Sequence, residues 1–171
     1  ADNGPTHQFK HSSFGTVISK DWETSVLKAG SLSAPVFTKN SFFIIDGETN
    51  LVSFDLTGRK VWMTDLGPNS EGRQRSQHSG GLAVHGEKIY ALTGFGEIIA
   101  LDVSKGTILW RRKFNSPFRG PPIIKNNRIY FVTADDLAVA MSPQGKILWS
   151  LEGPTKPTVL GKGVAPASSG N

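Results

Sequence analysis

The sequence contains no cysteine in its 171 residues. This absence excludes disulfide bonds, thiolate metal sites and a cysteine nucleophile from the chain. The longest apolar runs, such as Ile98 to Leu101, have the length of a strand, and none could span a bilayer as a helix. The chain also opens without an initiator methionine, a signal peptide or a lipid-attachment cysteine. We therefore expect Ala1 to be a boundary left by processing or cloning.

The charge of the chain is moderately basic, with 19 Lys and Arg against 14 Asp and Glu and a formal net charge of +5. The basic residues are scattered through polar segments such as Thr57 to Lys60 and Lys125 to Arg128. A nucleic-acid surface usually gathers such residues on one face and adds aromatic residues for stacking. The pattern therefore predicts no nucleic-acid partner.

One sequence unit occurs three times, at Ser33 to Trp62, Gly80 to Trp110 and Arg119 to Trp149. Each copy has four short apolar or alternating runs separated by three polar turns. The last turn contains glycine, and the last run closes on tryptophan. This pattern predicts four antiparallel strands joined by hairpin turns.

The four tryptophans give the period of the repeat. Trp22, Trp62, Trp110 and Trp149 are spaced by 40, 48 and 39 residues. A period near 40 residues with four strands in each period is typical of propeller blades. We therefore predict an all-β fold, a β-propeller with four-stranded antiparallel blades.

The repeat divides the chain into units. The predicted units are an N-terminal arm and strand of a preceding blade at 1–21, repeats at 22–62, 63–110 and 111–149, and a linker with the first strand of a further blade at 150–171. Three whole blades are below the usual minimum of about four, so we expect the chain to be part of a larger protein.

A surface loop is predicted at 66–79 within the second repeat, because its residues from Gly67 on include no apolar side chain. Arg73, Arg75 and His78 could bind an anion or a partner there, or the loop could simply be solvated.

The sequence predicts no catalytic residue. No serine lies in a Gly-x-Ser-x-Gly motif, and the carboxylates occupy turns. A side chain that recurs at the same turn of each blade is expected to cap that turn. The recurring turn positions are Asp55 and Asp102, with Ser142 in the third copy, followed by Gly58, Gly106 and Gly145. We assign them, with the four tryptophans, a structural role, and we predict neither a metal nor a cofactor.

Two repeat endings, Asp55 to Trp62 and Ile99 to Trp110, resemble the PQQ-type propeller repeat with its turn glycine and terminal tryptophan. More narrowly, the segments Gly80 to Ala83, Leu92 to Glu97 and Phe118 to Pro122 resemble the BamB family, in what looks like its alphaproteobacterial form. The resemblance implies an eight-bladed propeller, of which about four blades are present here. It implies a lipoprotein at the periplasmic face of the bacterial outer membrane, whose lipid anchor is expected to lie outside this chain.

The same resemblance implies a non-catalytic scaffold of the outer-membrane β-barrel assembly machinery. Such a scaffold binds the central subunit BamA through loops on one propeller face. Family members use apolar residues and an Arg in a loop that opens a blade, and Phe118 and Arg119 match that pattern. They also use acidic residues in the next blade's loop, where this chain has Gly161 to Gly163, so the second contact is not predicted.

Two arrangements of this pair stay open. Phe118 and Arg119 could both be exposed as a binding hot spot, or Phe118 could fold inward while Arg119 pairs with a nearby carboxylate.

A quinoprotein dehydrogenase fragment is the alternative function, because the repeats of such enzymes are similar. It would be expected to show a calcium-binding Glu/Asn/Asp set and, in many cases, a vicinal cysteine pair, and the sequence has no cysteine.

A propeller cut after about four blades also leaves apolar faces at its ends. Two chains could therefore join as a homodimer, or one chain could close a four-bladed ring.

Overall fold

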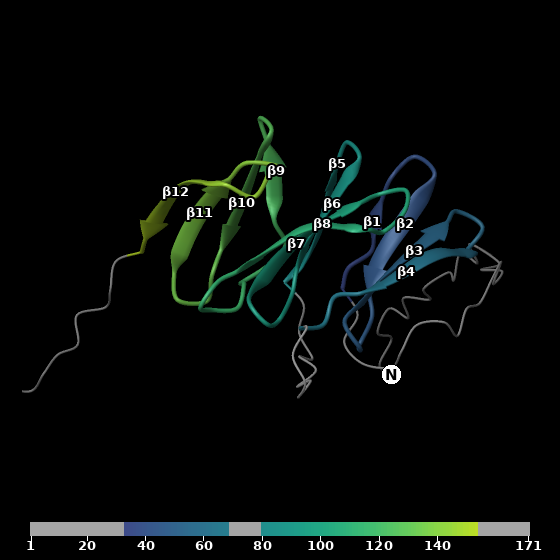
Figure 1. The fold of residues 1–171 in the computed structure, drawn as a ribbon, viewed down its shortest axis with the longest axis horizontal. Coiled ribbons are helices and arrows are strands. Elements are labelled where there is room, and N and C mark those ends of the chain that lie inside the picture. The colour runs from purple at the N-terminus through teal and green to yellow at the C-terminus, as the bar shows by residue number, and fades with distance from the viewer. Residues whose placement is uncertain (1–32, 69–79, 154–171) are drawn as a thin grey trace, which may run out of the picture.

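The computed structural model describes residues 33–68 and 80–153. The described part consists of three four-stranded antiparallel sheets, each a simple meander in chain order (Figure 1). The first sheet contains β1 (Val36–Phe37), β2 (Ser41–Ile45), β3 (Asn50–Asp55) and β4 (Lys60–Asp65). The second contains β5 (Gly81–His85), β6 (Lys88–Leu92), β7 (Glu97–Asp102) and β8 (Ile108–Lys113). The third contains β9 (Ile123–Lys125), β10 (Arg128–Val132), β11 (Leu137–Met141) and β12 (Ile147–Glu152).

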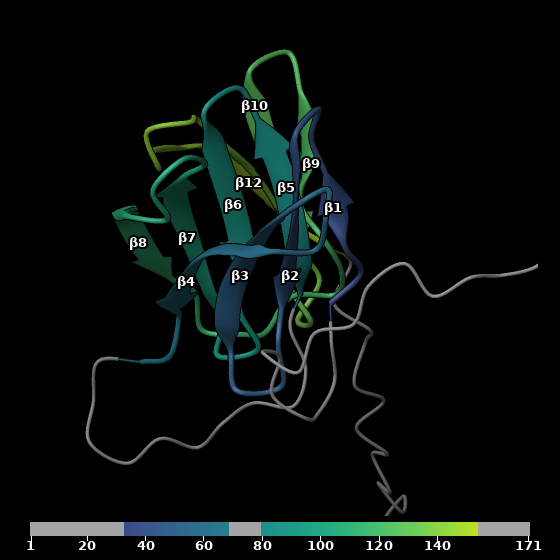
Figure 2. The ribbon, with the colours of Figure 1, turned by 90° about the vertical axis from the view of Figure 1, so that its right-hand side faces the viewer.

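The three sheets are successive blades, stacked face to face (Figure 2). The innermost strands β1, β5 and β9 contact one another in that order. The prediction of an all-β propeller with four-stranded antiparallel blades is therefore confirmed, and three blades lie within the described residues. The predicted N-terminal strand and most of the predicted further blade lie outside them.

The second strand of each blade turns into the third through the same local device. A side-chain oxygen at the first turn position caps the turn, and a residue with positive φ follows three positions later. Thr93 Oγ1 accepts the backbone N–H of Glu97 at 3.2 Å, and Gly96 has φ 75°. Thr133 and Asp136 repeat this arrangement in the third blade, with φ 66° at Asp136. The sequence thus fixes each hairpin locally.

The second blade is buried on both faces because its strands alternate between two cores. On β7, Ile99 and Leu101 pack toward the first blade, whereas Ile98 and Ala100 pack toward the third. This two-residue period is what a strand between two sheets requires. Burying each of the larger side chains, Ile98, Ile99 and Leu101, contributes about 1.5 to 3 kcal/mol, so the cores between blades dominate the stability.

The outermost strands run three residues past the repeat tryptophans, to Asp65, Lys113 and Glu152. Leu66, predicted to open a surface loop, is instead fully buried in the core between the first two blades. Its backbone N–H donates to Thr49 O at 3.0 Å, which continues the β4 edge by one residue. The sequence pattern misplaced Leu66 because the polar residues that follow it dominate the segment. Residues 69–79 of the predicted loop, including Arg73, Arg75 and His78, lie outside the described residues.

Candidate partner-binding site

The segment that joins the second and third blades carries Phe118 and Arg119. Phe118 points inward and is half-buried against the core between these blades. Its ring packs edge-on against Phe114, with ring centroids 5.9 Å apart, and against Phe131, at 5.3 Å. Phe114 and Phe131 complete the triangle at 5.1 Å. Edge-to-face aromatic pairs contribute about 0.5 to 1.5 kcal/mol beyond the area they bury, so Phe118 has a structural role.

Arg119 lies on the surface beside this cluster. Its Nη2 donates to Ala134 O at 3.0 Å and to Asp136 Oδ1 at 2.6 Å, and its Nε donates to Thr133 O at 3.3 Å. The side chain is still 54 % exposed. Within the described residues Nη1 makes no hydrogen bond, so its two N–H groups can serve a partner. Of the two arrangements open from the sequence, the structure therefore shows Phe118 inward and Arg119 paired with a carboxylate, and the role of both in partner binding stays a prediction.

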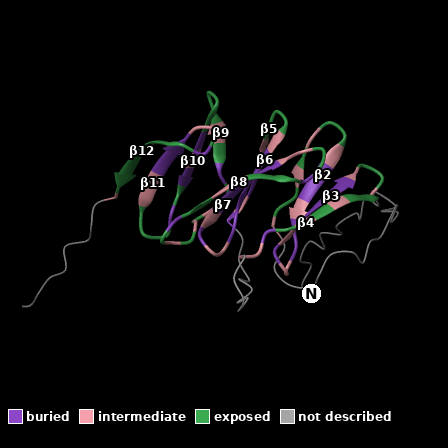
Figure 3. Ribbon diagram, viewed as in Figure 1, coloured by how far each residue is buried: buried purple, intermediate pink, exposed green. Residues whose placement is uncertain are grey.

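An apolar groove of about 310 Å³ runs along the third blade next to Arg119. Ile123, Tyr130, Val132 and Trp149 line it, and Trp149 is 45 % exposed. The outermost strand β12 is exposed along its whole length (Figure 3). Arg119 thus places a cation at the edge of an apolar surface that no part of residues 33–68 or 80–153 covers, which is the residue combination of a protein-binding site.

The tryptophans and turn glycines of the repeat contact each other between successive blades. Trp62 packs on Gly106 of the next blade and donates its indole N–H to Val103 O at 3.0 Å. Trp110 packs on Gly145 and donates to Pro143 O at 3.1 Å. Trp149 holds the matching position on the third blade, and Trp22 lies outside the described residues.

The recurring turn carboxylates cap the turns between the third and fourth strands. Asp55 Oδ1 accepts the backbone N–H groups of Thr57 and Arg59, each at 3.0 Å, and the Thr57 hydroxyl at 2.6 Å. Asp102 repeats this with Ser104 and Lys105. In both turns the hydroxyl that donates to the carboxylate, joined by the backbone N–H groups, lowers the pKa of the aspartate below its ordinary value of 3.8.

Ser142 occupies the equivalent position in the third blade and accepts Lys146 N–H at 3.2 Å. The glycines Gly58, Gly106 and Gly145 have φ 84°, 69° and 82°, a conformation that suits glycine.

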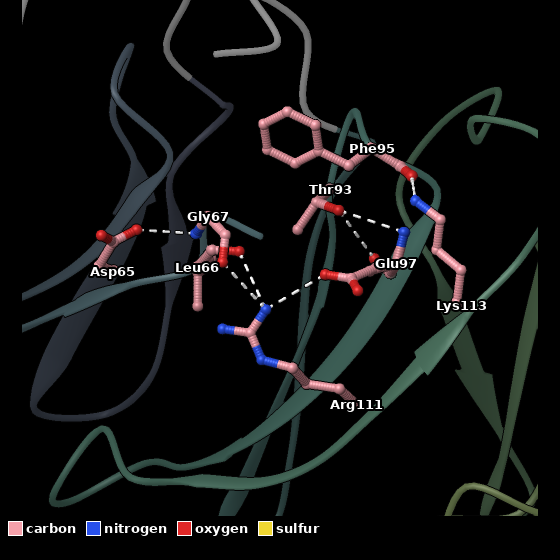
Figure 4. A network of polar contacts seen from close by, with 8 residues as sticks. All are labelled: Asp65, Leu66, Gly67, Thr93, Phe95, Glu97, Arg111 and Lys113. Atoms are coloured by element: carbon pink, nitrogen blue, oxygen red, sulfur yellow. Dashed lines mark hydrogen bonds and ion pairs between the residues drawn. The ribbon is translucent and has the colours of Figure 1, made fainter. Parts of the chain in front are cut away.

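Arg111 makes an inter-blade contact that the sequence did not indicate. Its Nη1 donates to Leu66 O and Gly67 O, both at 3.2 Å, and pairs with Glu97 Oε2 at 3.1 Å (Figure 4). The guanidinium therefore ties the end of the first blade to the second. No repeat signal could reveal it, because Met63 and Ser150 hold the equivalent positions in the other copies.

Among the described residues, no three His, Cys, Asp or Glu side chains gather in a way that could hold a metal ion. Within the same residues, none forms a helix with the length and hydrophobicity that crossing a membrane takes.

A sequence model of the family described as outer membrane protein assembly factor BamB matches residues 47–171. The chain belongs to this family. A BamB of Nitrosomonas eutropha is 28 % identical over 128 residues, which cover 74 % of this chain and 29 % of the relative. The chain thus spans less than a third of that BamB relative.

Solved structures show the same fold. The crystal structure of BamB from Moraxella catarrhalis matches with a TM-score of 0.54 and 20 % identity, over 66 % of this chain and 33 % of that one. The quinohemoprotein alcohol dehydrogenase of Comamonas testosteroni matches with a TM-score of 0.58 and 18 % identity, over 73 % of this chain and 21 % of that one. At these identities the likeness concerns the propeller fold and does not separate the BamB family from the dehydrogenase.

Proposed function

We propose that the chain is part of a non-catalytic scaffold in outer-membrane β-barrel protein assembly. It acts at the periplasmic face of the outer membrane, held by a lipid anchor outside these residues, and binds a BamA-like protein. Membership of the BamB family supports the assembly role. The relative from Nitrosomonas eutropha is named as an assembly factor, which supports the same role.

The choice of this binding site rests on the geometry of Arg119. Three hydrogen bonds to the β10–β11 turn hold its guanidinium in place, so little side-chain freedom would be lost on binding. The side chain remains half exposed at the edge of an apolar groove. Arginine and aromatic residues are enriched among the few residues that dominate interface energies. Phe118 supports the site indirectly, because its ring fixes the loop that carries Arg119.

The test is calorimetric titration of the periplasmic part of BamA with Arg119→Ala. We expect a loss of about 2 kcal/mol or more in binding free energy, which is the magnitude of a hot spot. Arg112→Ala is the matched control. Arg112 is an exposed arginine near the end of β8, at the end of the blades where Arg119 also lies. A folded Arg119→Ala chain that binds BamA with unchanged affinity would show that this residue is not the contact.

Phe118→Ala separates stability from binding. Because the ring is half-buried in the aromatic cluster, we expect a loss of about 2 kcal/mol in unfolding free energy, less than for a fully buried ring. A variant with unchanged stability and weakened BamA binding would instead mean that Phe118 contacts the partner directly.

The dehydrogenase fragment is the second candidate, favoured by the likeness of the fold to the Comamonas testosteroni enzyme. An absorption titration with pyrroloquinoline quinone and calcium tests it. A bound quinone spectrum would favour the enzyme, and an unchanged spectrum at saturating quinone would favour the scaffold.

A further inference from the structure

Six turns lie at one end of the three blades. In a four-stranded meander, the turn between the first and second strands and the turn between the third and fourth strands fall at the same end. Figure 1 shows the β1–β2, β5–β6 and β9–β10 turns along the upper edge of the molecule. We call this end the basic rim, defined by residues 38–40, 55–60, 85–88, 102–107, 125–128 and 142–146.

Cations that are far apart in the sequence lie at the same end of the three blades, on the basic rim. It carries eight Lys and Arg side chains against three carboxylates, Asp55, Glu87 and Asp102, a balance of +5. Seven of the eight are exposed, and Lys88 is half-buried. Lys39, Arg59 and Lys60 belong to the first blade, Lys88 and Lys105 to the second, and Lys125, Arg128 and Lys146 to the third.

The opposite rim has the reverse sign. Among the described residues it carries four cations, Arg111, Arg112, Lys113 and Arg119. They face seven carboxylates, a balance of −3, namely Asp46, Glu48, Asp65, Glu97, Asp135, Asp136 and Glu152. Arg119 lies on this second rim, next to Asp136 in the β10–β11 turn. The binding site proposed above therefore leaves the basic rim free, and the charges of residues 33–68 and 80–153 are polarised between the two ends of the blades.

The chemistry of the basic rim favours a broad anionic surface over a protein partner. Six of its eight cations are lysines, which are depleted in protein interfaces, whereas arginine and aromatic residues are enriched there. None of the turn residues at 38–40, 56–59, 86–87, 103–107, 126–127 and 142–146 is aromatic. The charges are also spread over three adjacent blades and do not converge on one pocket. Lysines distributed in this way suit a sheet of charge, because each adds to the attraction independently.

We propose that the basic rim binds the anionic headgroups of a phospholipid membrane surface. The binding is electrostatic and non-specific, so it strengthens with the fraction of anionic lipid and weakens with salt. It is independent of a lipid anchor and of partner binding on the opposite rim. A lipid-bound chain would thus present Arg119 away from the bilayer.

Vesicle co-sedimentation of the 171-residue chain tests the proposal. We compare phosphatidylcholine vesicles with and without phosphatidylglycerol, at low and at physiological ionic strength. The test variant is Lys39→Glu with Lys125→Glu, two exposed residues on different blades. The control is Arg112→Glu with Lys113→Glu, which makes the same charge change on the opposite rim. We expect the test variant to lose about tenfold or more in partitioning to phosphatidylglycerol vesicles, and the control to lose about twofold or less.

Three results would overturn the proposal. Equal losses in the two variants would mean that binding follows net charge alone. Equal partitioning to both kinds of vesicle would remove the anionic headgroup as the ligand. Binding to polyglutamate but not to vesicles would assign the basic rim to an acidic protein. Titration of BamA with the test variant keeps the two proposals apart, because its affinity should be unchanged.

Discussion

The indole of Trp62 lies against the backbone of Gly106 in the next blade, with its N–H bonded to Val103 O at 3.0 Å. Trp110 and Gly145 repeat this relationship one blade further on. The terminal tryptophan and the turn glycine, the two most regular residues of the sequence repeat, therefore contact each other between successive blades and not within one blade. A glycine is needed because a side chain at that position would occupy the space of the ring.

Gly106→Ala tests this contact. An added Cβ would lie 2.6 Å from Trp62 Cδ2 and 2.8 Å from Thr64 Oγ1, and the residue has φ 69°. The steric conflict and the left-handed backbone together predict a loss of about 2 to 4 kcal/mol in unfolding free energy. Gly86→Ala is the control, because φ is 59° and a Cβ there meets no atom within 4 Å. It should lose about 1 kcal/mol in denaturant titrations, and equal losses would show that backbone conformation alone requires the glycine.

The tryptophans should differ in their contribution to stability. Trp110 packs on Gly145 and is hydrogen-bonded, whereas Trp149 is 45 % exposed. We expect Trp110→Ala to lose about 3 to 5 kcal/mol and Trp149→Ala roughly half as much, because truncation costs scale with the contacts removed. Denaturant unfolding followed by circular dichroism measures both. Similar midpoints for the two variants would mean that the inter-blade contact of Trp110 adds little.

Much of the fold could be predicted because the blade is a local unit written several times. Each hairpin is set by nearby residues, such as Thr93 with Gly96, and repetition reinforces a signal that is weak in one copy. Contacts between blades are harder to predict from the sequence repeat. The Arg111 bonds to Leu66 and Gly67 depend on segments that are far apart in the sequence and occur in only one copy.

For the same reason, only part of the candidate binding site could be predicted from the sequence. The motif placed Phe118 and Arg119 on the segment between two blades, but it left their directions open. Packing decided them, because Phe114 and Phe131 lie where an inward ring completes an aromatic cluster. The difference in charge between the two rims could not be predicted from the sequence either. Turns that are distant in the sequence come to lie at one end only when the strands pair.

Arg111 and Glu97 should show measurable coupling. Both side chains are about four-fifths buried, with exposures of 20 % and 18 %, so water screens the pair only partly. We expect Arg111→Met to lose about 2 kcal/mol in unfolding free energy, since it leaves Glu97 and two carbonyls without their donor. A double-mutant cycle with Glu97→Gln should give a coupling energy of about 1 kcal/mol. Additive losses would show that the arginine acts only through the carbonyls of the first blade.

The turn aspartates predict a specific dependence of stability on pH. The pKa of Asp102 is lowered below 3.8 in the folded chain, chiefly by the Ser104 hydroxyl. Its stabilising contribution is therefore complete above the unfolded value and is lost as pH falls through the folded value. The melting temperature of Asp102→Asn should lie below that of the unmodified chain at pH 5, and the difference should shrink as pH falls below about 3.8. A difference that stays constant down to pH 2 would contradict a role for the carboxylate charge.

The outer face of the third blade, exposed among the residues that the structure describes, leads us to predict self-association. Ile123 and Trp149 line its apolar groove with exposures of 66 % and 45 %, and contiguous apolar surface of this kind favours burial against another chain. We expect light scattering to show a mass that rises with concentration toward a dimer. Ile123→Glu should shift the chain toward the monomer, because the dimer would bury an unpaired charge. Leu56→Glu is the control, since Leu56 is 55 % exposed on a turn at the basic rim, away from this groove. A monomeric mass for the unmodified chain at high concentration would remove the homodimer and favour a face covered by the chain's own residues.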